Sequence, residues 1–288
     1  VTREGLPGEL YGPEADRADG GDFLKRTAGD RHEVHAFDRL GLDIGDRDSV
    51  LGALTSIVPD VVINPAAWTA VDACESDPDR ALRDNTLGVR HLAEGARRIG
   101  ARVVHVSTDY VFDGTKSDPY VEWDDPNPRS VYGATKLAGE RELGPDATIV
   151  RTSWVCGFHG GNMVRTILRL AGEHETLRFV DDQRGHPTFA DDLARMIHRL
   201  VIDQRPGVFH VTNQGAVSWF EFAREVLAAA GLDPDRVEPV HTAELQPPRP
   251  APRPAHSVLD NAALRLCGIE LLDDFRAPLA RLVERLGT

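Results

Sequence analysis

The chain has 288 residues, of which 41% are hydrophobic and 27% charged, and its formal net charge is −13. These values are typical of a globular protein with a full core, and the negative charge disfavours a nucleic-acid or membrane-surface binder, since both partners are anionic. No apolar run approaches the roughly 18 residues that a transmembrane helix needs. The three scattered cysteines show no metal or disulfide spacing, so we expect a cytoplasmic protein.

Short apolar runs alternate with helical segments from residue 33 onward. Continuous apolar strands separated by helices are typical of a parallel sheet that is covered on both faces. The sequence therefore predicts an α/β fold with a Rossmann-like, doubly wound parallel sheet. We expect strands at 33–37, 61–64, 102–107 and 147–153, and helices at 46–57, 78–100 and 130–143.

The alternation loosens after Trp154. Ser218 followed by Glu221 is a capping box that predicts the start of a helix. The proline-rich stretch 246–254 excludes a helix or a central strand, so we expect a loop packed on the body, followed by two short helices. We also expect helices near 161–172, 189–203 and 218–231, and strands near 176–180 and 207–212.

Two structural parts are expected from this pattern. Residues 1–153 form a dinucleotide-binding domain, of which residues 1–20 are atypical. Residues 154–288 form mainly a smaller, C-terminal substrate-binding part that is interleaved with the first domain.

The stretch SVYGATKLAGE (130–140) places Tyr132 four residues before Lys136 on an expected helix. Residues at this spacing share one helix face, and a nearby cation favours the phenolate, so Tyr132 could act as an acid near neutral pH. An isolated pair at this spacing is more often a surface tyrosine stacked over a lysine stem. The surrounding residues decide between these interpretations.

Thr108 follows the expected strand 102–107, at the sheet edge where ligands of open α/β sheets bind. A hydroxyl, a phenol and an ammonium together suit the reduction of a carbonyl group. The hydroxyl holds the carbonyl, the phenol donates the proton, and the ammonium lowers the phenol pKa and can bond a ribose hydroxyl. The hydride then comes from a nicotinamide cofactor.

Three segments carry a resemblance to a known family: NPAAWTAVDACE (64–75), STDYVFDG (107–114) and VYGATKLAGE (131–140). They resemble the extended short-chain dehydrogenase/reductases and, more narrowly, the dTDP-4-dehydrorhamnose reductases. The likeness continues through RTSWVCG (151–157), FVDDQRGHPTFADDLA (179–194) and RPAHSVLDN (253–261), and covers about nine tenths of the chain.

The resemblance implies NAD(P)H-dependent reduction of the C4 ketone of dTDP-4-dehydro-L-rhamnose to dTDP-L-rhamnose. Two alternatives stay open. One is a related dTDP-4-keto-6-deoxyhexose 4-ketoreductase of another deoxysugar pathway, and the other is a non-catalytic binding or regulatory relative. A dTDP-sugar is the expected partner, and a homodimer is compatible with the sequence.

The resemblance also assigns residues to the site. Thr108, Tyr132 and Lys136 match the catalytic hydroxyl, acid and lysine. For Trp154 the alternative to a substrate contact is a core side chain, and for Arg184 it is a solvent-exposed side chain. A guanidinium nevertheless suits a diphosphate, because it forms paired hydrogen bonds with the oxygens. The implied cofactor contacts are Asp43 and Ile44 beside the adenine, Ala66, Ala67 and Thr69 in the adjoining loop, and Tyr132 and Lys136. The implied substrate contacts are Val71, Thr108, Asp109, Tyr110, Trp154 and Arg184. No histidine implies a metal site, and the sequence does not decide whether Mg²⁺ is needed.

The N-terminal segment departs from the pattern. A dinucleotide-binding fold normally begins with an apolar strand and a glycine-rich turn that holds the pyrophosphate at a helix N-terminus. Counting back from Asp38, Gly21 falls on the third glycine, but the first two positions fall on Ala15 and Ala18, and carboxylates stand beside them. The segment is an erroneous sequence, or the cofactor binds weakly, or the chain is a non-catalytic relative. The intact Thr-Tyr-Lys set argues against the last.

The residues after the expected strand at 33–37 leave the choice of cofactor open. Asp38 suits a free ribose 2′-hydroxyl, as in NADH, whereas Arg39 accommodates a 2′-phosphate, as in NADPH. The resemblance favours NADPH.

Overall fold

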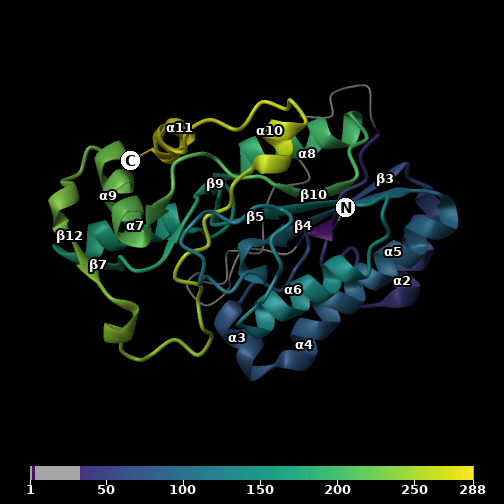
Figure 1. Ribbon diagram of the computed structural model, residues 1–288, viewed down its shortest axis with the longest axis horizontal. Helices are drawn as coiled ribbons and strands as arrows, with labels where there is room; N and C mark the ends of the chain where they lie inside the picture. The colour runs from purple at the N-terminus through teal and green to yellow at the C-terminus, as the bar shows by residue number, and fades with distance from the viewer. Residues whose placement is uncertain (1, 4–32, 288) are drawn as a thin grey trace.

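The structure is a computed structural model that describes residues 2–3 and 33–287. Its centre is a sheet of four parallel strands, and the carboxyl ends of β3, β4 and β5 lie at one edge of it (Figure 1). A second, two-stranded parallel sheet pairs Thr2 with Phe37 and Arg3 with Asp38. The four strands run in the order β10 (Gly207–His210), β5 (Thr148–Thr152), β4 (Arg102–Thr108) and β3 (Val61–Asn64), and the pair is β1 (Thr2–Arg3) with β2 (Phe37–Asp38).

Helices cover both faces of the four-stranded sheet. Successive strand residues point to opposite faces. Val103 accordingly lies in a core with α2 and α5, whereas Val104 lies in a core with α8, β10 and α10. The predicted α/β class and the parallel, doubly wound sheet are confirmed. The covering helices are α2 (Arg47–Ile57), α5 (Gly88–Ile99) and α6 (Val131–Arg141), and α8 (Ala190–Ile202) with α10 (Ala262–Leu266).

Two expected elements differ in detail. In place of the strand expected at 33–37 the structure has β2 (Phe37–Asp38), which pairs in parallel with Thr2–Arg3. The helix expected at 78–100 consists of α4 (Pro78–Leu82), a π-helical turn (Arg83–Leu87) and α5. Gly100 ends it with a φ of 76°, a left-handed conformation that favours glycine.

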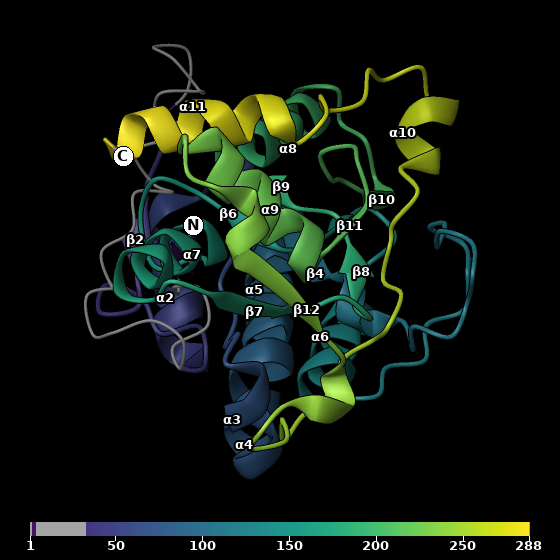
Figure 2. The same ribbon diagram turned by 90° about the vertical axis from the view of Figure 1, so that its left-hand side faces the viewer.

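The C-terminal part has its own apolar core. Figure 2 shows α9 (Trp219–Ala229) beside the parallel pair β7 (Leu177–Val180) and β12 (Val237–Val240). The predicted capping box is confirmed, since Ser218 Oγ accepts from Glu221 N at 3.1 Å and Glu221 Oε2 accepts from Ser218 N at 2.8 Å. The remaining elements are α3 (Val71–Ser76), α7 (Met163–Glu173), α11 (Arg276–Leu286), the short pairs β6 (Val155–Cys156) with β9 (Thr188–Phe189) and β8 (Arg184–Gly185) with β11 (Val217–Ser218), and 3₁₀ turns at 109–111, 234–236 and 242–244.

The two parts share the main sheet and are joined by the proline-rich loop. β10, which follows α8 in the chain, pairs with β5. Asp72 at the start of α3 accepts from Ala251 N at 3.1 Å and from two nitrogens of Arg253 at 2.7 Å each. The stretch 246–254 is thus a loop packed on the body, as predicted.

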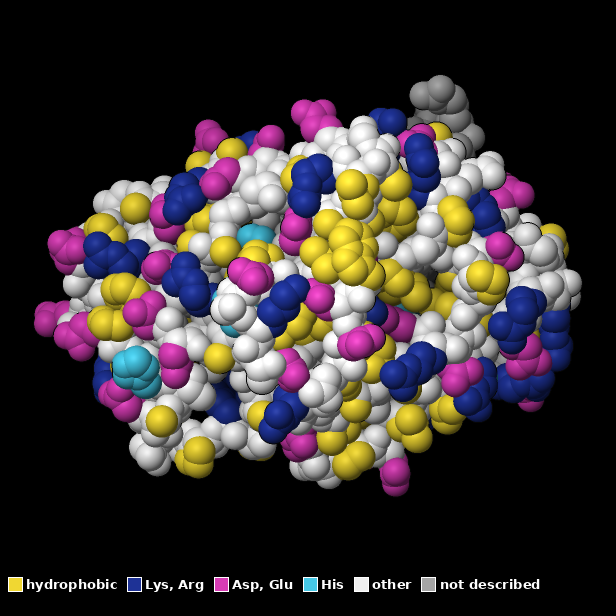
Figure 3. All heavy atoms as spheres, viewed as in Figure 1, with side chains coloured by type: hydrophobic (Ala, Val, Ile, Leu, Met, Phe, Trp, Pro, Cys, Tyr) yellow, Lys and Arg dark blue, Asp and Glu magenta, His cyan; other side chains and the backbone are white. Residues whose placement is uncertain are grey.

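Acidic and basic side chains are interspersed on the face seen in Figure 3. The negative charge is therefore not gathered into one patch on that face.

Over the residues that the structure describes, every helix is too short or too polar to span a membrane.

Candidate active site

Thr108 ends β4 at the carboxyl edge of the sheet, where the chain turns into the 3₁₀ turn 109–111. Its Oγ1 accepts from Tyr110 N at 3.2 Å and donates to Asp109 Oδ1 at 3.0 Å. Thr108 also lies close enough to the Tyr132 phenol to influence its pKa. The predicted hydroxyl and the predicted acid are therefore neighbours.

The start of α6 brings Tyr132 to this edge. Ser130 Oγ accepts from Gly133 N at 3.1 Å, and Glu75 Oε1 accepts from Val131 N at 2.8 Å, so the first turn of the helix is fixed at two points. A Cβ at Gly133 would lie 2.2 Å from the Tyr110 carbonyl oxygen. Only glycine lets the helix approach the turn closely enough for Tyr132 to reach Thr108.

Burial controls the acidity of Tyr132. The side chain is 8% exposed, and its ring meets the Tyr110 ring edge-on with centroids 5.5 Å apart. Burial raises the pKa of the Tyr132 phenol above its ordinary range, and the neighbouring Thr108 side chain opposes that rise. The sequence predicted a lowered pKa for this phenol, and this was wrong for the structure described here, because desolvation has the largest effect on it.

Lys136 lies one turn along α6 and is 2% exposed. Its Nζ donates to the Val106 carbonyl at 2.7 Å and lies 3.2 Å from His105 Nε2. Burial lowers the pKa of Lys136 to about 8, against an opposing effect of Glu140. The Lys136 amino group is thus held by β4, and a positive charge on it is costly at this position.

A buried ion pair lies beneath the lysine. Glu140, on the next turn of α6, receives hydrogen bonds from Arg151 at 2.7 to 3.2 Å and one from Ser107 Oγ at 2.5 Å. Both members of the pair have side chains that are 5% exposed. This contact holds the last turn of α6 against β4 and β5, and so helps to position Tyr132 and Lys136 relative to the sheet.

The loop after β3 (residues 65–70) carries the residues that were expected beside the cofactor. Ala66 and Ala67 are buried and small, and Ala66 N donates to Asn64 Oδ1 at 3.1 Å. The π-helical turn holds this loop, since Asn85 Oδ1 accepts from Trp68 N at 2.7 Å. Thr69 lies partly buried in the same loop.

The remaining expected cofactor residues have protein partners. Asp38 Oδ1 accepts from Gly41 N at 2.7 Å, and Arg39 lies 3.9 Å from Asp84. Asp43 forms an ion pair with Arg83, and Ile44 is 7% exposed in the α2–α5 core. Gly21, Ala15 and Ala18 lie outside the described residues.

Three expected substrate residues adjoin Tyr132. Val71 and Tyr110 pack in one apolar cluster with its ring. Asp109 is 1% exposed, and burial raises the pKa of its carboxyl to about 6, against the opposing effects of Ser257 and Thr108. A carboxyl that changes charge near pH 6 thus lies directly behind Thr108.

Trp154 and Arg184 form a separate group. Trp154 has a φ of 46°, which is unusual for a bulky residue, and its ring stacks on Trp219 with centroids 3.5 Å apart. Arg184 Nη1 lies 3.0 Å from a carboxylate oxygen of Glu221, and its side chain is 40% exposed. Ser257 lies between the two groups, because its N donates to the Arg184 carbonyl at 2.9 Å while its side chain is near enough to Asp109 to influence the pKa of that carboxyl.

Comparisons with known proteins identify the family of this chain. Residues 19–288 match the family described as the RmlD substrate binding domain. This chain belongs to that family. A dTDP-4-dehydrorhamnose reductase from Streptomyces griseus is 44% identical over 255 residues, which cover 85% of this chain and 83% of the relative. A dTDP-4-keto-6-deoxy-D-glucose reductase from Streptomyces niveus is 41% identical over 254 residues, covering 87% and 88%. The crystal structure of a dTDP-4-dehydrorhamnose reductase from Bacillus anthracis in complex with NADP superposes with a TM-score of 0.88 at 36% identity, covering 94% of this chain and 97% of the other.

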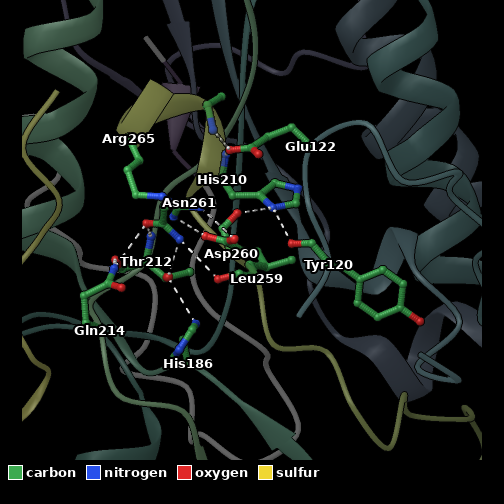
Figure 4. A network of polar contacts seen from close by, with 11 residues as sticks. Tyr120, Glu122, His186, His210, Thr212, Gln214, Leu259, Asp260, Asn261 and Arg265 are labelled. Atoms are coloured by element: carbon green, nitrogen blue, oxygen red, sulfur yellow. Dashed lines mark hydrogen bonds and ion pairs between the residues drawn. The ribbon is translucent and has the colours of Figure 1, made fainter. Parts of the chain in front are cut away.

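A polar network of buried side chains joins β10 to the segment around Asp260 (Figure 4). His210 Nδ1 lies 3.1 Å from the carbonyl oxygens of Tyr120 and Asp260, so it carries the proton and donates to them. Asn261 donates to Thr212 Oγ1 at 2.9 Å, and Thr212 Oγ1 lies 3.2 Å from His186 Nδ1. The network ties β10 to the C-terminal segment that carries Ser257.

Sequence reasoning missed several residues of the site. His105 and Asn64 lie beneath Lys136, and Trp219 lies beneath Trp154. A polar residue inside the apolar run RVVHVS was a signal for His105, since buried polar groups need partners. The closeness of Ser257 to Asp109 had no signal in the local pattern, because it joins segments about 150 residues apart.

Within the part of the chain that the structure describes, no group of three or more His, Cys, Asp or Glu side chains is arranged to hold a metal ion.

Proposed function

We propose that this chain reduces the C4 ketone of dTDP-4-dehydro-L-rhamnose to the hydroxyl of dTDP-L-rhamnose, with NADPH as the reductant. The observation that carries the proposal is the closeness of the Tyr132 phenol to Thr108 at the carboxyl edge of the sheet, with Lys136 one turn away. Membership of the RmlD family and the reductase names of its relatives support the choice of substrate.

The residues that the structure describes fit a nicotinamide cofactor. The wall formed by Ala66 and Ala67 carries only methyl side chains, which permit close approach of a planar ring. Tyr132 and Lys136 offer hydroxyl and amine groups of the kind that bond a ribose. When bound, NADPH supplies the hydride. The NADP complex of the Bacillus anthracis relative favours the phosphorylated cofactor, and Arg39 offers a cation for its 2′-phosphate.

The chain's own residues manage the proton. Thr108 positions the ketone oxygen beside Tyr132, and the Tyr132 hydroxyl donates its proton to that oxygen. The raised pKa of the phenol keeps the acid protonated until it is used. A charged Lys136 then stabilises the phenolate that is left behind.

The second group serves the nucleotide end of the substrate. We assign Trp154 to the sugar nucleotide and Arg184 to its diphosphate, which would have to compete with Glu221 for the guanidinium. Val71, Asp109 and Tyr110 line the sugar side. In this arrangement residues 1–153 carry the cofactor and 154–288 mainly carry the substrate.

A direct test is turnover of NADPH with dTDP-4-dehydro-L-rhamnose, with product identification. Consumption of NADPH and formation of dTDP-L-rhamnose support the proposal. Faster turnover of dTDP-4-keto-6-deoxy-D-glucose would favour the activity named for the Streptomyces niveus relative. Binding of the sugar nucleotide without turnover would favour a non-catalytic relative.

The cellular setting follows from the proposed reaction. We place the enzyme in the cytoplasm, where reduced cofactor and sugar nucleotides are available together. A homodimer and a role for Mg²⁺ stay predictions that sedimentation and chelation can test.

A further inference from the structure

A row of buried polar groups runs from Lys136 to the loop beside the expected cofactor. Lys136 Nζ lies 3.2 Å from His105 Nε2, and His105 Nδ1 lies 3.1 Å from Asn64 Nδ2. Asn64 Oδ1 accepts from Ala66 N at 3.1 Å. His105 and Asn64 are each 0% exposed and face each other across paired strands β3 and β4.

The hydrogens of this row do not permit a charged lysine in the arrangement seen. Because Ala66 N–H occupies Asn64 Oδ1, the amide presents its NH₂ group to His105 and donates to Nδ1. A neutral imidazole that accepts at Nδ1 carries its proton on Nε2, which then points at Lys136. An ammonium has no lone pair, so two donors would face each other. The conflict disappears when Lys136 is a neutral amine that accepts from His105 and donates to Val106.

A second arrangement suits the charged lysine. If the His105 proton moves to Nδ1, Nε2 accepts from the Lys136 ammonium. The main-chain carbonyl of Asn64, which favours a protonated ring, then accepts from Nδ1. The Asn64 NH₂ group loses its acceptor in this state. The imidazole tautomer and the charge of Lys136 are therefore coupled.

We propose that His105 is a positioning residue whose tautomer, set by Asn64, changes with the charge on Lys136 and so controls when that charge is present. The inference rests on the proposed reaction for its effect on catalysis. A charged Lys136 favours the phenolate that remains when Tyr132 has given up its proton, so the tautomer would govern activity at alkaline pH.

The other ionisable groups around Lys136 are not positioned to control its charge in the way proposed for His105. Glu140 is paired with Arg151 and favours the charged form. The remaining buried titratable groups on α6 and on the elements packed against it are Tyr132, Cys74, Asp84 and Asp109. Among all these groups, the His105 ring is the one in hydrogen-bond contact with Lys136 Nζ.

The kinetic test uses two substitutions that act in opposite directions. In Asn64→Asp a carboxylate accepts from Nδ1–H and frees Nε2 for the ammonium, so the alkaline limb of the kcat/KM profile should move up by about 1 pH unit. In His105→Leu the ammonium loses its acceptor, so the limb should move down by a similar amount. His198→Leu removes an imidazole on α8, an element that carries none of the proposed site residues, and should leave the limb in place.

A spectroscopic test needs neither substitution nor turnover. In protein with ¹⁵N-labelled histidine, the His105 signals should report the Nδ1–H tautomer below the titration of Lys136 and the Nε2–H tautomer above it. Lys136→Met should abolish the change. One tautomer throughout pH 6 to 10 in the wild type would overturn the inference, even with turnover intact. A tautomer change in a protein without turnover would overturn the proposed reaction but not the coupling.

Discussion

Lys136→Met should change the pH dependence of folding stability as well as remove activity. The pKa of Lys136 falls from 10.5 in the unfolded chain to about 8 in the folded one. A group with a lowered pKa binds its proton less readily when folded. The charged lysine therefore lowers the free energy of unfolding by the full amount below about pH 8, and this effect disappears as the pH rises past 10.5. A shift of this size corresponds to about 3 kcal/mol.

Methionine fills a similar volume and does not titrate. Between pH 7 and pH 10 the free energy of unfolding of the wild type should therefore rise by about 2 to 3 kcal/mol relative to the variant. Urea unfolding at several pH values measures both proteins in parallel. The difference between pH values is informative even if the lost hydrogen bond to Val106 shifts all values for the variant by a constant amount. If the free energies of unfolding of the wild type and the variant changed in parallel with pH, the pKa of Lys136 would not be lowered in the folded protein.

Three further predictions address the ligands. Tyr132→Phe keeps the ring packed against Tyr110, so circular dichroism should be unchanged while kcat falls by about 100-fold or more; near-normal turnover would remove Tyr132 from the mechanism. Trp154→Ala should raise the Kd for the dTDP-sugar more than the Kd for NADPH in calorimetric titrations; equal losses would indicate that the indole serves only to pack on Trp219. A chain carrying an apolar strand and a Gly-x-x-Gly-x-x-Gly turn ahead of Gly21 should bind NADPH much more tightly than this chain, because the backbone could then approach the pyrophosphate; equal, tight affinities by fluorescence would show that residues 1–20 already hold it.

The sequence was informative where local rules decide the structure. The apolar runs at 61–64 and 102–107 became β3 and β4, and the Ser218–Glu221 pair capped α9. The spacing of Tyr132 and Lys136 placed both on one side of α6. These features depend on periodicity and capping, which neighbouring residues determine.

Other features depend on contacts between distant segments. The pKa of Tyr132 moved opposite to the expected direction, because spacing along a helix reveals a neighbouring cation but not how deeply the phenol is buried. Arg184 was expected at a diphosphate, and its partner Glu221 lies on another element. The atypical glycine positions Ala15 and Ala18, and Gly21, lie outside the described residues, whereas Thr2–Arg3 pair with β2.

The position of β10 has a practical consequence for dissecting the protein. A fragment that stops at residue 153 would contain the three proposed catalytic residues, Thr108, Tyr132 and Lys136, and would correspond to the predicted dinucleotide-binding domain. It would also lack β10, which pairs with one side of β5, so the N–H and C=O groups of β5 that face β10 would be unpaired along an exposed sheet edge. Such edges recruit strands from other copies. We expect that fragment to self-associate, and we expect catalysis to require both halves of the chain in one polypeptide.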